Sequence, residues 1–173
     1  MNGIGSFSKG LSDVIALMED QKYDRALKRL EELQKAWPGS AQLSIVWSRL
    51  VQLTDEPTHS LNDAKRALQQ AIELDKQSPA AAIELGYFLD NVEDDPHAAA
   101  KAFAQGITAA RHALIEGLLG HARALIQLEK RDDAARCLIE ALHLSDAERS
   151  SKKNPFAGRI EELLAELGQT QSA

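Results

Sequence analysis

The chain has 173 residues, of which 44% are hydrophobic and only 5% aromatic, so it can bury a core built mainly from Ala and Leu. Its formal net charge of −6 argues against general nucleic-acid binding, which draws on clustered Lys and Arg. The acidity is uneven, because residues 80–112 contain five carboxylates and two basic side chains. Five Pro and ten Gly leave long uninterrupted segments, which favours helices over many short strands.

The sequence also bears on the compartment. A single cysteine, Cys137, excludes an internal disulfide and a cysteine-rich zinc site. Residues 1–21 lack the basic start and unbroken apolar run of a secretory signal. No apolar stretch approaches the ~20 residues that would cross a bilayer. We therefore expect a soluble protein of the reducing cytoplasm that does not associate with membranes.

In chain order, the first predicted elements are two helix pairs. The pair in residues 7–40 contains the helical segment YDRALKRLEEL and ends near Pro38, because proline stops a helix. The pair in residues 41–78 is interrupted by DEPTH (Asp55–His59), which has the composition of a loop.

Two further pairs and a last helix follow. The third pair occupies residues 79–113, with Pro79 at its start and VEDDP as its turn, and the fourth occupies residues 114–146. A polar linker, residues 147–153, leads to a capping helix at residues 154–168. Asn154 suits its N-cap, Pro155 its first position and Gly168 its end. Its apolar stripe consists of Phe156, Ile160, Leu163, Leu164 and Leu167.

One pattern recurs in the second helix of every pair. It is anchored on an alanine, at spacings of 38, 35 and 35 residues: Ala26, Ala64, Ala99 and Ala134. Four residues later comes a large apolar side chain: Leu30, Leu68, Phe103 and Leu138. Seven residues after the anchor the side chain is mostly small: Leu33, Ala71, Gly106 and Ala141. These offsets place the three positions on one helical face, where small residues allow a neighbouring helix to approach closely.

These residues resemble the tetratricopeptide repeat, a helical hairpin of about 34 residues. Tyr23, Ala26, Leu30 and Pro38 match its pattern in the first pair, and the Leu85–Gly86 dipeptide matches in the third. The resemblance implies an all-α, right-handed α-solenoid of about four hairpins with a C-terminal capping helix, forming a single domain over residues 1–173. A plain helical bundle is the alternative, and a different α-solenoid would change little about function.

Catalysis is not expected. The five histidines show no metal-ligand spacing, and Cys137 is predicted to be a buried, inert thiol without a basic partner. The segment GIGSFSKG lacks the spacing of a phosphate-binding loop. We expect no catalytic residue, metal or cofactor.

The resemblance implies instead that the first helix of each pair lines a concave groove, which accepts a peptide or a partner helix. From the helical register, the groove-facing candidates are Ile15, Met18, Arg49, Gln52, Tyr87, Asp90, Arg123 and Gln127. Tyr87 is either a contact anchor or a side chain packed against the adjacent hairpin. Arg49 and Arg123 could pair with Asp90 or with a partner's carboxylate. The family's carboxylate-gripping positions hold Leu11, Ile15, Val46 and Glu84, which argues against binding of a chaperone tail.

The expected function is therefore non-catalytic binding of another protein, as an adaptor, assembly factor or chaperone. Two alternatives stay open. One is a dedicated inhibitor or secretion chaperone of a single protein, and the other is a self-assembling subunit whose apolar face between Leu11 and Met18 forms a homo-oligomer contact. The sequence does not decide between the concave and convex faces as the binding surface.

Overall fold

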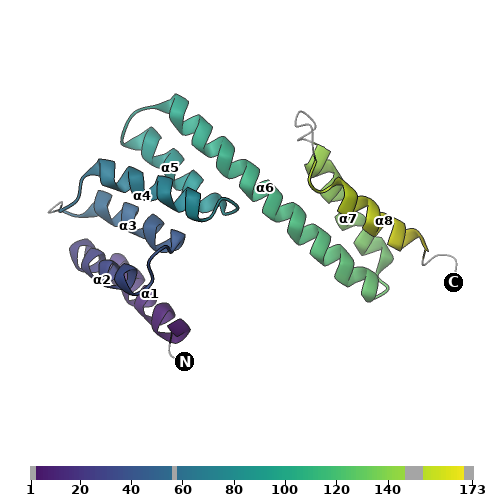
Figure 1. Ribbon diagram of the computed structural model, residues 1–173, viewed down its shortest axis with the longest axis horizontal. Helices are drawn as coiled ribbons and strands as arrows, with labels where there is room; N and C mark the ends of the chain where they lie inside the picture. Colours follow the sequence, from purple (N-terminus) through teal and green to yellow (C-terminus); the bar gives the residue numbers. More distant parts are fainter. Residues whose placement is uncertain (1–2, 56–57, 147–153, 170–173) are drawn as a thin grey trace. The chain divides into compact units, whose positions relative to one another are not determined.

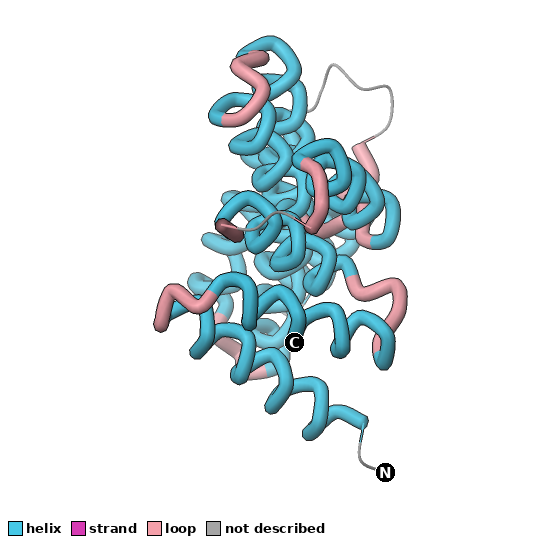
Figure 2. Tube along the Cα trace, turned by 90° about the vertical axis from the view of Figure 1, so that its left-hand side faces the viewer, coloured by secondary structure: helices cyan, strands magenta, loops and turns pink. Residues whose placement is uncertain are grey.

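A computed structural model describes residues 3–55, 58–146 and 154–169 of the chain. These residues form eight helices and no strand (Figures 1 and 2), which confirms the expected all-α class. The helices are α1 (Gly3–Glu19), α2 (Tyr23–Ala36), α3 (Ala41–Leu53), α4 (Leu61–Leu74), α5 (Pro79–Asn91), α6 (Pro96–Gln127), α7 (Arg131–Asp146) and α8 (Ala157–Gln169). The chain divides into two compact units, unit 1 (residues 1–108) and unit 2 (residues 109–173), and α6 contributes to both.

Unit 1 is a stack of helical hairpins. Helices α1 to α5 pack one against the next in chain order, and α3 also contacts α5. The first part of α6 lies close against α5, because a Cβ atom on Gly86 would come within 2.6 Å of the Phe103 ring. Likewise, a Cβ atom on Gly106 would come within 2.7 Å of the Ile83 side chain. Both glycines thus allow a close helix contact, and the repeat pattern had predicted the one at Gly106.

Unit 2 has its own core. Ile115 and Leu119 of α6 pack with Leu138 of α7 and with Phe156 and Ile160, which lie just before and within α8. All five side chains are buried.

The side chains at the predicted repeat positions are mostly buried between the helices. The four anchor alanines, Ala26, Ala64, Ala99 and Ala134, are all at most 2% exposed. Three of the four large side chains that follow them, Leu30, Leu68 and Leu138, have no exposed surface. The exception is Phe103, which is partly buried and packs on the core of unit 1. The anchor pattern is confirmed.

The same turn occurs before α2 and before α7. In the first, the Gln21 amide donates to the Met18 carbonyl (3.0 Å) and the Lys22 amide to the Leu17 carbonyl (2.8 Å). In the second, Glu129 and Lys130 donate in the same way to Ile126 (3.0 Å) and Leu125 (2.9 Å). This pair of bonds is the Schellman motif, whose central residue is left-handed. Gln21 (φ 58°) and Glu129 (φ 59°) both adopt that conformation, so the segments QKYDRALKRLEEL and EKRDDAARCLIEAL share a turn as well as a helix.

Other predicted helix boundaries lie at the residues that stop or start a helix. Trp37 follows the last residue of α2 and precedes Pro38, and Gly39 has a φ of 84° that a side chain would disfavour. Pro79 is the first residue of α5, where its missing amide proton leaves no hydrogen bond unmade.

One predicted boundary does not exist. The second helix of the third pair and the first helix of the fourth pair are a single helix, α6, so there are eight helices in the described residues and not the nine expected. The physical reason lies in residues 107–116, ITAARHALIE, which contain no Gly, Pro, Asn, Asp or Ser, and whose Thr108 hydroxyl donates to the Ala104 carbonyl of the same helix (3.0 Å). The spacing of the repeat predicted a turn here, but the local composition favours continued helix.

The last helix begins slightly later than predicted. The Asn154 side chain accepts a hydrogen bond from the Phe156 amide (2.9 Å), so it caps the turn that leads into α8. The helix runs through Gly168 to Gln169, so Gly168 is not its end. The predicted linker, residues 147–153, lies outside the described residues. The assignment of residues 1–173 to a single domain stays a prediction.

A capping box starts α4. The Asp63 carboxylate accepts from the Ser60 hydroxyl (2.7 Å) and amide (3.0 Å) and also contacts Arg66, while the Ser60 hydroxyl accepts from the Asp63 amide (3.1 Å). The hydrogen bonds from Ser60, followed by that from Arg66, lower the pKa of Asp63 from 3.8 to about 2.

This lowered pKa predicts a contribution to acid unfolding. Since the folded-state pKa lies below the unfolded one, the stabilisation is complete above pH 3.8 and is lost as the pH falls towards 2. Urea titrations between pH 6 and pH 2 should therefore show a smaller acid loss of unfolding free energy for Asp63→Asn than for the wild type. Asp90→Asn removes an exposed carboxylate of α5 and serves as the charge-matched control against which the effect of Asp63→Asn is compared. Equal slopes for all three proteins would show that the capping box does not titrate in this way.

Candidate functional site

A groove between α1 and α3 has a mainly apolar lining. It encloses about 450 Å³ and is lined by Leu11, Ile15, Met18 and Glu19 of α1 and by Gln42, Val46 and Arg49 of α3. Pockets that bind ligands commonly have about 300–1,000 Å³ and a mainly hydrophobic lining with a few polar groups. The groove has this size and this composition.

Its floor results from the spacing of the two helices. Leu11, Ile15 and Met18 stand at intervals of four and three residues, which places them on one face of α1. Val14 is fully buried beside them and holds α1 on the core, whereas Ile15 is 47% exposed. The amphipathic pattern of α1 therefore leaves apolar surface in contact with solvent.

Arg49 closes one end of the groove. Its Nε donates to Oε1 of Glu84 on α5 at 2.7 Å, and a second guanidinium nitrogen contacts the other oxygen of the same carboxylate. This two-point contact holds the pKa of the Arg49 guanidinium above its ordinary value, because Glu84 accepts hydrogen bonds from the charged form. The acidic partner of Arg49 is thus Glu84 and not Asp90, which is exposed.

The other predicted groove residues do not line this groove. The Gln52 amide donates to the Ser48 carbonyl of its own helix (3.0 Å). Tyr87 is 54% exposed, and its ring meets Phe103 edge-on at 5.1 Å, so it packs within its own hairpin while still reaching solvent. Arg123 and Gln127 are exposed and belong to unit 2. The structure therefore brings together Ile15, Met18 and Arg49 from the predicted set.

Four lining residues were not among the predicted groove-facing candidates: Leu11 and Val46 had been named only as positions that grip a carboxylate in the resembled family, and Glu19 and Gln42 had not been named as groove residues. Glu19 is the last residue of α1, and Gln42 is the second residue of α3. The helical register could have indicated both, since Glu19 stands one turn from Ile15 and Gln42 stands two turns from Arg49.

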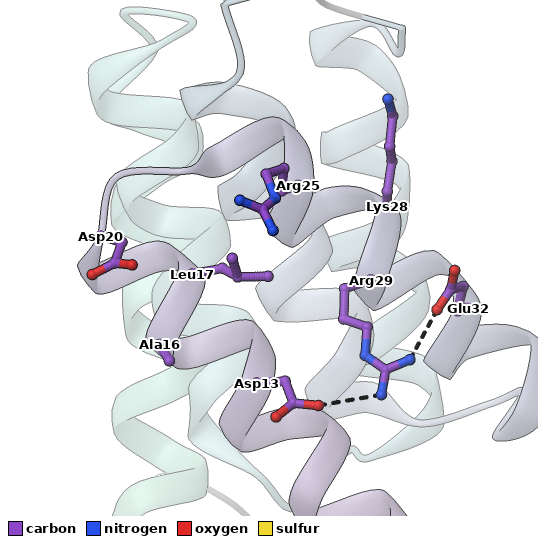
Figure 3. Close-up of a pocket in the computed structure, with 8 residues that line it drawn as sticks. All are labelled: Asp13, Ala16, Leu17, Asp20, Arg25, Lys28, Arg29 and Glu32. Carbon is purple, nitrogen blue, oxygen red and sulfur yellow. Dashed lines mark hydrogen bonds and ion pairs between the residues drawn. The ribbon is translucent and has the colours of Figure 1, made fainter.

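A second depression, of about 580 Å³, lies between α1 and α2 and carries mixed charge (Figure 3). Arg29 donates to Asp13 (3.2 Å) and to Glu32 (2.9 Å), which raises the pKa of its guanidinium through these two hydrogen bonds, first that with Glu32. Arg25, Lys28 and Asp20 also line it. Because its acidic and basic groups are interspersed and partly paired, this surface presents no concentrated charge to a ligand.

His59 and Cys137 both have contacts that the sequence did not reveal. His59 lies 2.7 Å from Glu31 through Nε2 and edge-on to Trp47 at 4.8 Å, so it ties the loop before α4 to α2 and α3. Cys137 was expected to be buried with no basic partner, but it is half-buried and its Sγ lies 3.7 Å from Nδ1 of His121. The two residues stand 16 positions apart on neighbouring helices, so no local pattern linked them.

Neither a metal site nor a membrane span occurs in the part of the chain that the structure describes. No three His, Cys, Asp or Glu side chains in that part of the chain come together as ligands for a metal ion. None of its helices has both the length and the apolarity that a membrane span requires.

Comparison with known proteins adds little. No model of a protein family matches the chain, and no curated protein matches it. A solved structure, the crystal structure of MamA protein, is similar over 94% of this chain and 88% of that chain, with 15% sequence identity and a TM-score of 0.48. This score is too low to establish a common fold, so the fold is defined by the helices of this chain themselves.

Proposed function

We propose that the chain is a non-catalytic binding module that holds a segment of another protein in the groove between α1 and α3. The observation that carries this proposal is the apolar lining of the groove, in which Ile15 keeps 47% of its surface exposed. Apolar side chains gathered in a groove with polar groups at its ends form a surface that gains free energy when a partner covers it.

The repeat pattern in the sequence supports the same proposal. Helical hairpins of the tetratricopeptide type present the first helix of each pair to a partner, and α1 and α3 are the first helices of their pairs. We propose that the chain is a divergent member of that family and acts as an adaptor, assembly factor or chaperone.

A matched pair of substitutions tests the proposal. Ile15 in the groove and Ile139 on α7 are both exposed isoleucines within helices, at 47% and 52%. Ile15→Ser should weaken partner binding about tenfold, which corresponds to about 1.4 kcal/mol, because it removes apolar contact from the complex. Neither substitution should lower the unfolding free energy by more than about 0.5–1 kcal/mol, since both side chains already face solvent.

The measurement begins with tagged wild-type protein, Ile15→Ser and Ile139→Ser as baits in extracts of the native cell. Proteins retained by the wild type and Ile139→Ser but lost with Ile15→Ser are then purified, and their dissociation constants are measured by calorimetry. Equal binding of every partner to the two variants would contradict the groove as the site. If Ile15→Ser instead dissociates an oligomer seen by light scattering, the groove is covered by a second copy of the chain.

A further inference from the structure

Most of the net negative charge of the chain belongs to unit 1. Residues 1–108 contain 11 Lys and Arg against 16 Asp and Glu, a net charge of −5 out of the −6 of the whole chain. A partner that approaches unit 1 therefore meets a negative field, which favours cationic segments.

The groove itself also carries a net negative charge when the ion pairs within the chain are taken into account. Arg49 is neutralised by Glu84. Glu19 is exposed, and in the part of the chain that the structure describes it contacts no cation. The carboxylate of Glu19 is therefore available to a partner, while the guanidinium of Arg49 is already engaged.

Helix direction adds to this effect. The chain reverses at the turns on either side of α2, so α1 and α3 run the same way, and Glu19 and Arg49 lie at the same end of the groove. That end is formed by the C-terminal turns of both helices. Helix C-termini carry partial negative charge, which stabilises cations placed near them.

The spacing of the lining indicates the shape of the occupant. On α1 the groove positions are 11, 15 and 18, and on α3 they are 42, 46 and 49, so each helix contributes an i, i+4, i+7 row. Such a row extends about 10.5 Å at 1.5 Å per residue. A partner helix with apolar side chains at the same intervals matches this length and settles between the two rows.

We infer that the occupant of the groove is a basic amphipathic helix of another protein. Its apolar stripe packs on Leu11, Ile15, Met18 and Val46, and a Lys or Arg at one end of the stripe pairs with Glu19. This inference rests on the proposed function, because it names the chemistry of the partner at the same groove.

Designed peptides test the inference on the full chain. Three fluorescein-labelled 18-residue peptides share one leucine stripe at i, i+3, i+4 and i+7. The first has Lys on its polar face, the second has Glu, and the third is the Lys peptide with a central proline that breaks the helix. Binding is followed by fluorescence anisotropy at low and physiological salt. The Lys peptide should bind at least about tenfold more tightly than the Glu peptide, and the proline should weaken binding about tenfold or more.

Variants then locate the contact. Glu19→Lys should weaken the Lys peptide about three- to tenfold, with less effect at high salt, because it replaces an exposed ion pair with a repulsion. Glu140→Lys makes the same change of charge on an exposed site of α7 and should leave binding almost unchanged. Ile15→Ser should weaken both charged peptides, since it alters the apolar floor without altering charge.

The outcomes separate the two proposals. If the Glu peptide binds as tightly as the Lys peptide and Ile15→Ser weakens both, the groove binds proteins but the basic partner is wrong. If Glu140→Lys weakens the Lys peptide as much as Glu19→Lys does, the attraction is general and the inference fails. Equal binding of the proline peptide overturns the helical occupant, and binding of no peptide overturns the inference outright. None of these last three results alters the capture experiment that tests the proposed function.

Discussion

Replacing Phe156 with Ala should lower the unfolding free energy of unit 2 by about 3–5 kcal/mol, because it empties the centre of a small core. The Phe156 side chain is 5% exposed and packs in one cluster with Ile115, Leu138 and Ile160. Its ring also meets the His112 imidazole edge-on at 5.2 Å. Since the cluster joins α6 and α7 to the segment around α8, the loss of this ring removes much of what holds the last helix in place.

Two spectroscopic probes report the effect. Both tryptophans, Trp37 and Trp47, belong to unit 1, so their fluorescence follows unit 1, while far-ultraviolet circular dichroism follows every helix. In urea titrations, Phe156→Ala should shift the dichroism transition to lower urea, and comparison with fluorescence shows whether the loss is confined to unit 2. Leu164→Ala changes a side chain of α8 that is 40% exposed and should cost much less. A Phe156→Ala transition identical to that of the wild type would mean that the last helix is a dispensable tail.

The sequence predicted the hairpins well, because their signals are local. Pro79, the Ser78 side chain that accepts from the Ala80 amide (3.4 Å), and the alanine anchors act within one or two turns of the helix that they shape. Local signals also explain the shared turn at Gln21 and Glu129, although neither residue is the glycine usual at that position. Helix boundaries and turns that depend on residues within about ten positions of one another could therefore be predicted.

The fusion of two predicted helices in α6 shows where a periodic argument fails. The period of about 35 residues required a turn near residue 113, but a turn needs residues that stop a helix, and residues 107–116 have none. Each residue added to an existing helix costs less than starting a new one, so composition outweighs period here. A search for caps at each expected turn could have found the discrepancy.

The side-chain partners at the groove could not be predicted, because they join residues distant in sequence. Arg49 and Glu84 stand 35 residues apart, and nothing local indicates that Glu84 and not Asp90 accepts from Arg49. Tyr87 was predicted either to serve as a contact anchor or to pack against neighbouring residues. Its ring packs on Phe103, and 54% of its surface stays exposed. The binding role of these residues stays a prediction.

Substitution of an anchor alanine by a larger side chain is the second change expected to have a large effect on stability. Ala64→Leu should lower the unfolding free energy of unit 1 by about 1–3 kcal/mol, because three extra carbon atoms must fit where α4 meets α3 and α5. Ala64 has no exposed surface, so the added atoms cannot turn towards solvent. Alanine and leucine have similar helix propensities, so the change reports packing and not the stability of the isolated helix.

The same substitution on an exposed site provides the control. Ala104 lies on the exposed face of α6, and Ala104→Leu should stay within about 0.5 kcal/mol of the wild type. Ala134→Leu, at the equivalent anchor in α7, should be as costly as Ala64→Leu, but in unit 2. Tryptophan fluorescence in urea should therefore detect Ala64→Leu directly, while dichroism should detect both anchor variants. If Ala64→Leu unfolds at the same urea concentration as Ala104→Leu, the helices of unit 1 meet at other residues, and the repeat that anchors the hairpins is misplaced.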